Sequence, residues 1–280
     1  MSRHRRRTVA FASSALALDY SHPEFTPVIE ALYGDMPAAP PGDPPVTYRL
    51  RAGGNQFTLH RNDSRIYSGD SLPQLADLLL GNSCHHLADR SHGGLLFHAG
   101  AVERQGRGLI LPGTMGAGKT TLTAWLLTRG FNYLSDEMVF VGQGEERLQP
   151  LPRPLNLKRP SRAVLAPWLD FEARAGQIIS TDFIDLLPPA LLNPATRLSR
   201  PPLRLIIFPR YQSGAEFRLE ALSKAQAGAA LMQCLINARN LPGHGFDEIG
   251  RLARLAPAYR LTYAHFEQLG DSLESLLAGA

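Results

Sequence analysis

The sequence predicts an α/β fold organised around a phosphate-binding loop. Residues 108–111 form a short apolar run typical of a buried strand, and residues 121–129 have the pattern of a helix that Gly130 would end. The segment that joins them fits G-x-x-x-x-G-K-[ST]. A strand, a glycine-rich loop and a helix start, in this order, form an anion site at the helix N-terminus.

The loop consists of Gly113, Thr114, Met115, Gly116, Ala117, Gly118, Lys119, Thr120 and Thr121. Its backbone N–H groups would surround a β-phosphate at the positive end of the helix dipole. We expect the Lys119 amine to reach the β- and γ-phosphates of ATP and the Thr120 hydroxyl to complete a Mg²⁺ shell. The alternative is a glycine-rich turn that matches by chance, and the flanking strand and helix favour the nucleotide site.

The chain of 280 residues can hold one large domain, or a core domain with a smaller extension. Four arginines near its start (Arg3, Arg5, Arg6 and Arg7) account for the net charge of +4. A basic face for nucleic acid is therefore not expected across the folded body. Only three of the 29 basic residues are lysines, Lys119 among them, which indicates that the loop requires an amine.

The first 18 residues allow two interpretations. The arginines and the apolar run from Val9 to Leu18 resemble a secretory signal, but Ser13 and Ser14 interrupt the run. Because an ATP-using enzyme belongs where ATP is, we favour a loose basic arm on a cytoplasmic protein. No run approaches the ~20 apolar residues that cross a bilayer, so no membrane partner is expected.

Residues 1–90 predict a small N-terminal extension with antiparallel β structure. Residues 34–46 form a proline-rich connector. Three alternating segments that predict a meander follow, at residues 46–50, 56–60 and 64–67. Ser71 then opens a predicted helix.

An acidic pair carries the second chemical signal. Residues 94–103 predict a strand that places His98 beside the loop, and Asp136 and Glu137 interrupt the predicted strand at residues 131–140. A carboxylate beside a phosphate loop can hold Mg²⁺ or accept a proton from an attacking hydroxyl. Both can serve one site only if the strand bends, because adjacent strand residues point to opposite faces. A solvated acidic turn is the alternative.

Three further cations are candidates for the catalytic site. Prolines keep residues 151–160 extended, and Arg153 and Lys158 could direct positive charge at a transferring phosphoryl group. Arg210 ends a predicted buried strand at residues 203–211 and could contact phosphate. The alternatives are ordinary surface cations and an edge residue.

The remaining elements complete a catalytic domain at residues 91–280. Residues 165–200 are predicted to be loop-rich with short helices. Helix, helix, strand and helix then follow at residues 221–240, 246–255, 259–263 and 266–277. Cys84 and Cys234 lie in different helical patterns, so we expect reduced core residues rather than a disulfide.

His98, the loop from Gly113 to Thr120 and the segment Leu134-Ser135-Asp136-Glu137 resemble the catalytic core of bacterial HPr kinase/phosphorylase. They look more similar still to HPr-kinase-related proteins, which are often found beside peptide-modification genes. Residues 94–160 match well and residues 203–265 match loosely. The resemblance implies an α/β P-loop kinase core of the HPr kinase and phosphoenolpyruvate carboxykinase type, with a mixed sheet and the antiparallel N-terminal extension.

The resemblance also implies ATP, Mg²⁺ and phosphoryl transfer to a serine-type hydroxyl. By position, Asp136 would be the base that accepts the hydroxyl proton, His98 would orient the hydroxyl, and Thr120 with Glu137 would serve the metal. Glu137 stands where the family has aspartate, and the glycine-containing signature tied to phosphorylase activity is not found. Neither HPr as substrate nor the reverse reaction is therefore predicted.

We predict an ATP-dependent kinase that phosphorylates a serine-type hydroxyl of a peptide or small protein. Two alternatives stay open: a small-molecule hydroxyl kinase, and a nucleotide-gated peptide-binding module without turnover. An Asp136→Asn substitution should leave a binding module intact and stop a kinase. A homo-oligomer is compatible with the sequence.

Overall fold

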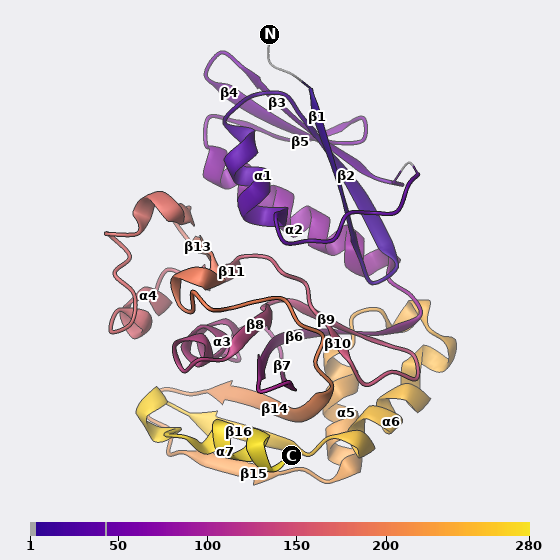
Figure 1. The fold of residues 1–280 in the computed structure, drawn as a ribbon, viewed down its shortest axis with the longest axis vertical. Coiled ribbons are helices and arrows are strands. Elements are labelled where there is room, and N and C mark those ends of the chain that lie inside the picture. The colour runs from indigo at the N-terminus through magenta and orange to yellow at the C-terminus, as the bar shows by residue number, and fades with distance from the viewer. Residues whose placement is uncertain (1–3, 43) are drawn as a thin grey trace.

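The computed structural model describes residues 4–42 and 44–280, which form three sheets with helices between and around them. Figure 1 shows a sheet near the N-terminus at one end of the molecule and a larger sheet through its middle and lower part. A small arm carrying β11, β13 and α4 lies beside α3. The fold is therefore α/β, as the sequence predicted.

The central sheet has eight strands in the order β10-β9-β6-β7-β14-β16-β15, and β8 also pairs with β6. Its strands are β6 (Gly94–Arg104), β7 (Arg107–Pro112), β8 (Asn132–Ser135), β9 (Met138–Gly142), β10 (Leu148–Gln149), β14 (Leu203–Tyr211), β15 (Arg218–Ala221) and β16 (Ala258–Tyr263). β7, β14 and β16 are parallel, whereas β6 runs antiparallel to β7, β8 and β9. The sheet is mixed, as predicted, and the three parallel strands end at one edge, where the loop after β7 lies.

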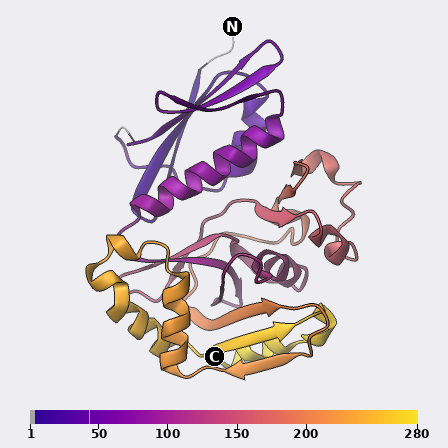
Figure 2. The same cartoon turned by 180° about the vertical axis from the view of Figure 1, so that it is seen from behind.

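Helices cover both faces of this sheet, and Figure 2 shows α5 and α6 from behind. Its helices are α3 (Lys119–Thr128), α5 (Lys224–Cys234), α6 (Phe246–Leu255) and α7 (Ser272–Gly279). Leu109 and Leu111 of β7 join the hydrophobic cluster of α3 and α7, whereas Ile110 joins the cluster of α5 and α6. Burial on both faces explains why these strands have continuous apolar sequences.

The N-terminal sheet has five strands in the order β1-β2-β3-β4-β5. Its elements are β1 (Arg5–Phe11), β2 (Ser14–Tyr20), α1 (Phe25–Tyr33), β3 (Thr47–Gly53), β4 (Gln56–Arg61), β5 (Ser64–Gly69) and α2 (Leu72–Arg90). The predicted meander is confirmed as β3, β4 and β5, and α2 begins after Ser71 as predicted. The purely antiparallel prediction is wrong, because β2 and β3 pair in parallel across a crossover that contains α1.

The prediction of a loose basic arm is wrong for the part of it that the structure describes. Arg5, Arg6 and Arg7 lie in β1, which pairs with β2 as a hairpin, and Arg3 lies outside the described residues. The hairpin turn contains Ala12 and Ser13 at φ 49° and 65°, so the serines that interrupt the apolar run mark a turn. The side chains that flank the turn, including Phe11 and Leu16, are buried.

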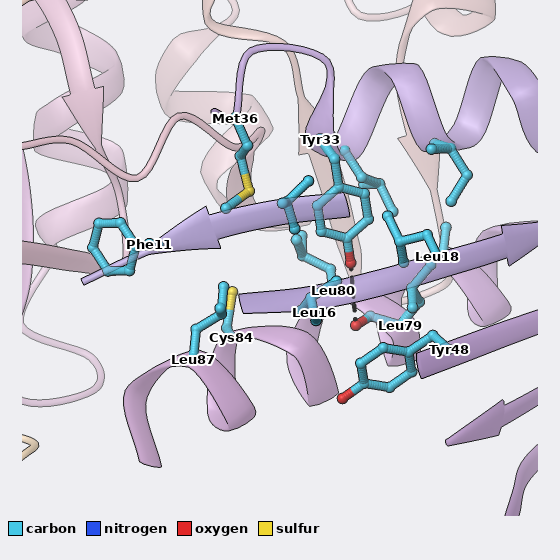
Figure 3. Packing of buried hydrophobic residues seen from close by; sticks show 14 of the residues in the cluster. Phe11, Leu16, Leu18, Tyr33, Met36, Tyr48, Leu79, Leu80, Cys84 and Leu87 are labelled. Carbon is cyan, nitrogen blue, oxygen red and sulfur yellow. Dashed lines mark hydrogen bonds between the residues drawn. The ribbon is translucent and has the colours of Figure 1, made fainter. Parts of the chain in front are cut away.

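The hydrophobic cluster of the N-terminal sheet continues into the central sheet. Figure 3 shows its centre, where the Tyr33 hydroxyl donates to Leu79 O at 3.4 Å. The cluster also contains Leu96 of β6 and Met138 and Phe140 of β9. The N-terminal sheet is therefore packed onto β6, which carries His98, and onto β9, which follows the acidic pair, and the cluster crosses the predicted domain boundary after residue 90.

The third sheet forms the arm, in the order β11-β13-β12. Its elements are β11 (Leu155–Lys158), α4 (Ser161–Leu165), β12 (Ile179–Ser180) and β13 (Ile184–Leu187). The predicted extended segment at residues 151–160 thus ends in an edge strand. Short 3₁₀ helices occupy Ala175–Gln177, Pro189–Leu191, Ala238–Asn240, Pro242–Gly245 and Phe266–Gln268.

Two predicted helices are shorter in the structure than in the sequence pattern. The helix predicted at residues 221–240 ends at Cys234, because Ile236 N donates to Leu96 O and returns the chain to the sheet. The helix predicted at 266–277 becomes a 3₁₀ turn followed by α7. Cys84 and Cys234 are free and buried, as predicted. None of the described helices combines the length and apolar composition needed to cross a bilayer.

The shared cluster predicts that Phe140 stabilises the whole chain. Phe140 is 7% exposed, and its ring lies 6.5 Å from that of Phe11. We expect Phe140→Ala to lower the free energy of unfolding by about 3–5 kcal/mol, measured by urea denaturation. Phe183→Ala is the matched control: its side chain is 80% exposed, so a change within about 0.5 kcal/mol is expected. Equal effects of the two substitutions would contradict the packing.

Candidate active site

The loop between β7 and α3 brings a helix N-terminus, left-handed glycines and a lysine together. Gly116 and Gly118 have φ values of 85° and 92°, and α3 begins at the next residue, Lys119. A Cβ at Gly118 would lie 2.9 Å from the Tyr263 hydroxyl and 3.0 Å from the Cβ of Tyr211. Both the conformation and the space therefore require glycine. The first amides of α3 lack intrahelical acceptors, so the helix start can bind an anion.

The Lys119 side chain folds over this loop. Its Nζ donates to the carbonyl oxygens of Gly113 and Thr114, at 2.8 and 2.9 Å. Burial lowers the pKa of Lys119, and the carboxylates of Asp136 and Glu137 oppose this shift. The amine therefore lies within electrostatic reach of both acids that the sequence places beside the loop.

The chain bends at the acidic pair, between β8 and β9. The Ser135 hydroxyl donates to Met138 O and accepts from Met138 N at 3.2 Å, which fastens the bend. Ala99 N of β6 donates to Glu137 O. Because both acids belong to the bend rather than to a regular strand, the geometric condition set by the sequence is met: the two carboxylates can face one site.

Asp136 is a buried carboxyl group with an unused acceptor atom. The residue is 2% exposed, its Oδ2 accepts from Asn156 N at 2.9 Å, and its Oδ1 has no hydrogen-bond partner. Burial raises the pKa of Asp136 to about 7, helped by Glu137 and opposed by Arg153, the Asn156 amide and Thr120. The desolvation cost exceeds the stabilisation by its neighbours, so the carboxyl group holds its proton up to near-neutral pH.

Glu137 lies between a histidine and an arginine. Its Oε2 accepts from Arg153 Nη2 at 3.0 Å, and its Oε1 lies 3.5 Å from His98 Nε2. Burial lowers the pKa of His98, Lys119 adds to the effect, and Glu137 opposes it. His98 is therefore neutral at physiological pH and can donate or accept a hydrogen bond at the site.

Arg153 connects the site to the N-terminal part of the chain. Arg153 is 4% exposed, and besides Glu137 its guanidinium group contacts the Cys84 sulfur of α2 at 3.8 Å. The sequence suggested that Arg153 points its charge at phosphate. In the structure the charge of Arg153 instead pairs with the Glu137 carboxylate, and loss of this partner would leave the buried guanidinium group without it.

The oxygen donors near the bend fit the requirements of Mg²⁺. Asp136 Oδ1 is unpaired, the Glu137 side chain is 39% exposed, and the Thr120 hydroxyl is close enough to lower the pKa of Asp136. Mg²⁺ takes such hard oxygen ligands, usually one or two carboxylates together with water and substrate phosphates. No group of three or more His, Cys, Asp or Glu side chains suited to a metal occurs within residues 4–42 and 44–280. Thr120 and Glu137 stay predicted metal ligands.

The other two cations predicted for the site lie in different surroundings. Lys158 is exposed at the end of β11, and its charge contributes to lowering the pKa of Lys119. Arg210 is exposed near the end of β14. Along β14, Leu205 and Ile207 face α3, so strand alternation places Arg210 on the opposite face. The structure thus brings the charge of Lys158 within electrostatic reach of Lys119, whereas Arg210 lies on the face of the sheet opposite α3.

Several contacts at the site were not predicted from the sequence. The Asn156 amide holds Asp136, and the Thr121 hydroxyl lies 3.1 Å from that of Ser161 on α4. Tyr211 N donates to Ala117 O of the loop at 3.1 Å. Backbone donors carry no residue-type signal, so no sequence pattern indicated the contact between Asn156 and Asp136.

Comparison with known proteins finds similarity among solved structures alone. No protein-family model and no curated protein matches the chain. Among solved structures, the Hpr(Ser) kinase/phosphatase from Coxiella burnetii is similar at a TM-score of 0.33 and 12% identity, over 66% of this chain and 94% of that chain. A TM-score of this size carries no functional argument, so the proposals below rest on the residues described above.

The raised pKa of Asp136 predicts a pH-dependent stability difference between the wild type and Asp136→Asn. The folded-state pKa of about 7 exceeds the ordinary value of 3.8, so the wild type loses stability as pH rises from about 4 through about 7. At about 1.4 kcal/mol per pKa unit, the variant should gain about 4 kcal/mol on the wild type over this range. Urea denaturation at pH 4.5, where the folded-state carboxyl group is protonated, and at pH 8, where it is ionised, measures the difference.

Asp185→Asn is a control of opposite sign. Burial tends to raise the pKa of Asp185, but hydrogen bonds from Arg162 and Ser180 outweigh burial and lower the pKa. The wild type should therefore be more stable than Asp185→Asn at neutral pH, and the gap should narrow as pH falls. Parallel pH curves for wild type and Asp136→Asn would show that the Asp136 carboxyl is not desolvated.

Proposed function

We propose that the chain is an ATP-dependent kinase that transfers the γ-phosphoryl group to a serine-type hydroxyl of a peptide or small protein. One observation carries the proposal: the buried Asp136 carboxyl group, with an unpaired Oδ1, lies beside the lysine of a glycine-rich loop at a helix start. The loop supplies an anion site, and the carboxyl group supplies a proton acceptor next to it.

The pKa of Asp136 suits a general base. A base works best when its pKa lies near the operating pH, because it is then both deprotonated and basic enough to take a proton. An exposed aspartate with a pKa near 4 would be deprotonated at neutral pH but would be a weak base. Burial at the bend is the physical cause of the difference, and perturbed carboxyl groups of this kind occur at catalytic sites.

The proposed step is an in-line transfer. The acceptor hydroxyl gives its proton to Asp136 while its oxygen bonds to the γ-phosphorus, and the bond from that phosphorus to the β–γ bridging oxygen breaks, so ADP leaves with the bridging oxygen. Neutral His98 would hydrogen-bond and orient the hydroxyl. Lys119 would turn from the carbonyl oxygens of its own loop to the phosphates.

Mg²⁺ would neutralise phosphate charge in this reaction, with Thr120 and Glu137 as the residues to hold it. Arg153 would keep the Glu137 carboxylate in place without itself touching substrate. Lys158 would add positive charge at the same side of the loop. The acceptor class, a peptide or small protein, follows from the resemblance of the sequence to HPr-kinase-related proteins.

Substitution of Asp136 separates catalysis from nucleotide binding. We expect Asp136→Asn to lower turnover by about 10²–10⁴-fold, because the hydroxyl proton loses its acceptor, while the ATP dissociation constant stays within about threefold. The measurement is phosphate transfer from labelled ATP to candidate peptides, with mass mapping of the product, alongside calorimetric ATP binding.

Two further variants serve as controls for this experiment. Lys119→Ala should weaken ATP binding whether or not the protein turns over, and Asp182→Asn, an exposed acid on the arm, should change neither quantity. Full turnover in Asp136→Asn would remove Asp136 as the base. Wild-type protein that binds no nucleotide would remove the kinase proposal altogether.

A further inference from the structure

Tyr211 is a half-exposed aromatic side chain fixed against the glycine-rich loop. Its backbone N donates to Ala117 O at 3.1 Å, and its Cβ lies 3.0 Å from where a Cβ of Gly118 would be. Even so, 49% of the side chain is exposed. An aromatic ring held this firmly beside an anion site, yet left open to solvent, has a surface available for a ligand.

The order of the strands decides which end of a nucleotide would meet this ring. Asp136 follows β8, which pairs with β6 on one side of β7, whereas Tyr211 ends β14 on the other side of β7. The γ-phosphate must face Asp136 for the proposed transfer. The phosphate chain would then cross the loop after β7, and the nucleoside end would emerge over the end of β14.

Tyr211 also lies on the face of the sheet that α3 covers. Leu205 and Ile207 of β14 pack in the cluster that contains α3, and strand alternation puts Tyr211 on this same face. The buried Tyr263 ring lies 6.0 Å from the Tyr211 ring in an edge-to-face arrangement. Tyr263 therefore restricts the Tyr211 ring from beside it. Because the ring is already restricted, the Tyr211 side chain loses less conformational entropy when a base stacks on it.

We infer that Tyr211 is the platform on which the base of the bound nucleotide stacks. The inference rests on the proposed function, because it takes the loop as the site of the triphosphate. Stacking uses the π-face that every base has, so this contact does not distinguish adenine from guanine. Tyr211 thereby binds the part of the ligand that the loop, Lys119 and Asp136 do not touch.

The test compares a ligand that has a base with one that has none. Tyr211→Ala should weaken binding of ATP by about tenfold to a hundredfold, the range seen when stacking aromatics are removed. Binding of inorganic triphosphate should be unchanged, since the backbone bond to Ala117 remains. Tyr211→Phe should keep wild-type affinity for both ligands, and Phe246→Ala, which removes a ring that is 67% exposed on α6, should also have no effect.

Each other outcome is informative. Equal weakening of ATP and triphosphate by Tyr211→Ala would show that the side chain only supports the loop, and would overturn the inference. Unchanged ATP binding would place the base elsewhere and overturn it too, while leaving the kinase proposal standing. Wild-type protein that binds neither ligand would overturn the proposed function and, with it, this inference.

Discussion

Burial of the Asp136 carboxyl group is the constraint on which the site depends. Three segments that are distant in sequence enclose it: the bend after β8, the Asn156 amide of β11, and the start of α3 with Lys119 and Thr120. An isolated buried carboxylate is unfavourable, and here Arg153 and the amide offset only part of that cost. The fold thus retains a destabilising buried carboxyl group, which is typical of functional sites.

The central sheet explains why these groups meet. One of its faces is covered throughout by the cluster of α5 and α6, whereas the other is shared between α3 with α7 and the N-terminal sheet. His98 and the acidic pair lie at the junction of the two layers on the shared face. Arg153 spans this junction, from Glu137 to Cys84 of α2. The N-terminal sheet is therefore part of the support of the site.

The sequence predicted the elements whose signals are local. The loop, the strands around it, α6 and the bend at the acidic pair follow from glycine spacing and apolar runs. The β1–β2 hairpin was missed because its turn residues, Ala12 and Ser13, are not the usual glycine or asparagine. The direction of Arg153 and the burial of Asp136 depend on contacts between distant segments, which no local pattern encodes. The domain boundary and the catalytic and metal roles stay predictions.

A direct titration of the Asp136 carboxyl group tests the account most simply. Carbon NMR of protein labelled at aspartate carboxyls, assigned with Asp136→Asn, gives the pKa of this group in the nucleotide-free protein. The account predicts a pKa of about 7, with burial as the cause. A pKa near the ordinary aspartate value of about 4 would mean that the carboxyl is solvated, and would contradict its assignment as a base matched to neutral pH.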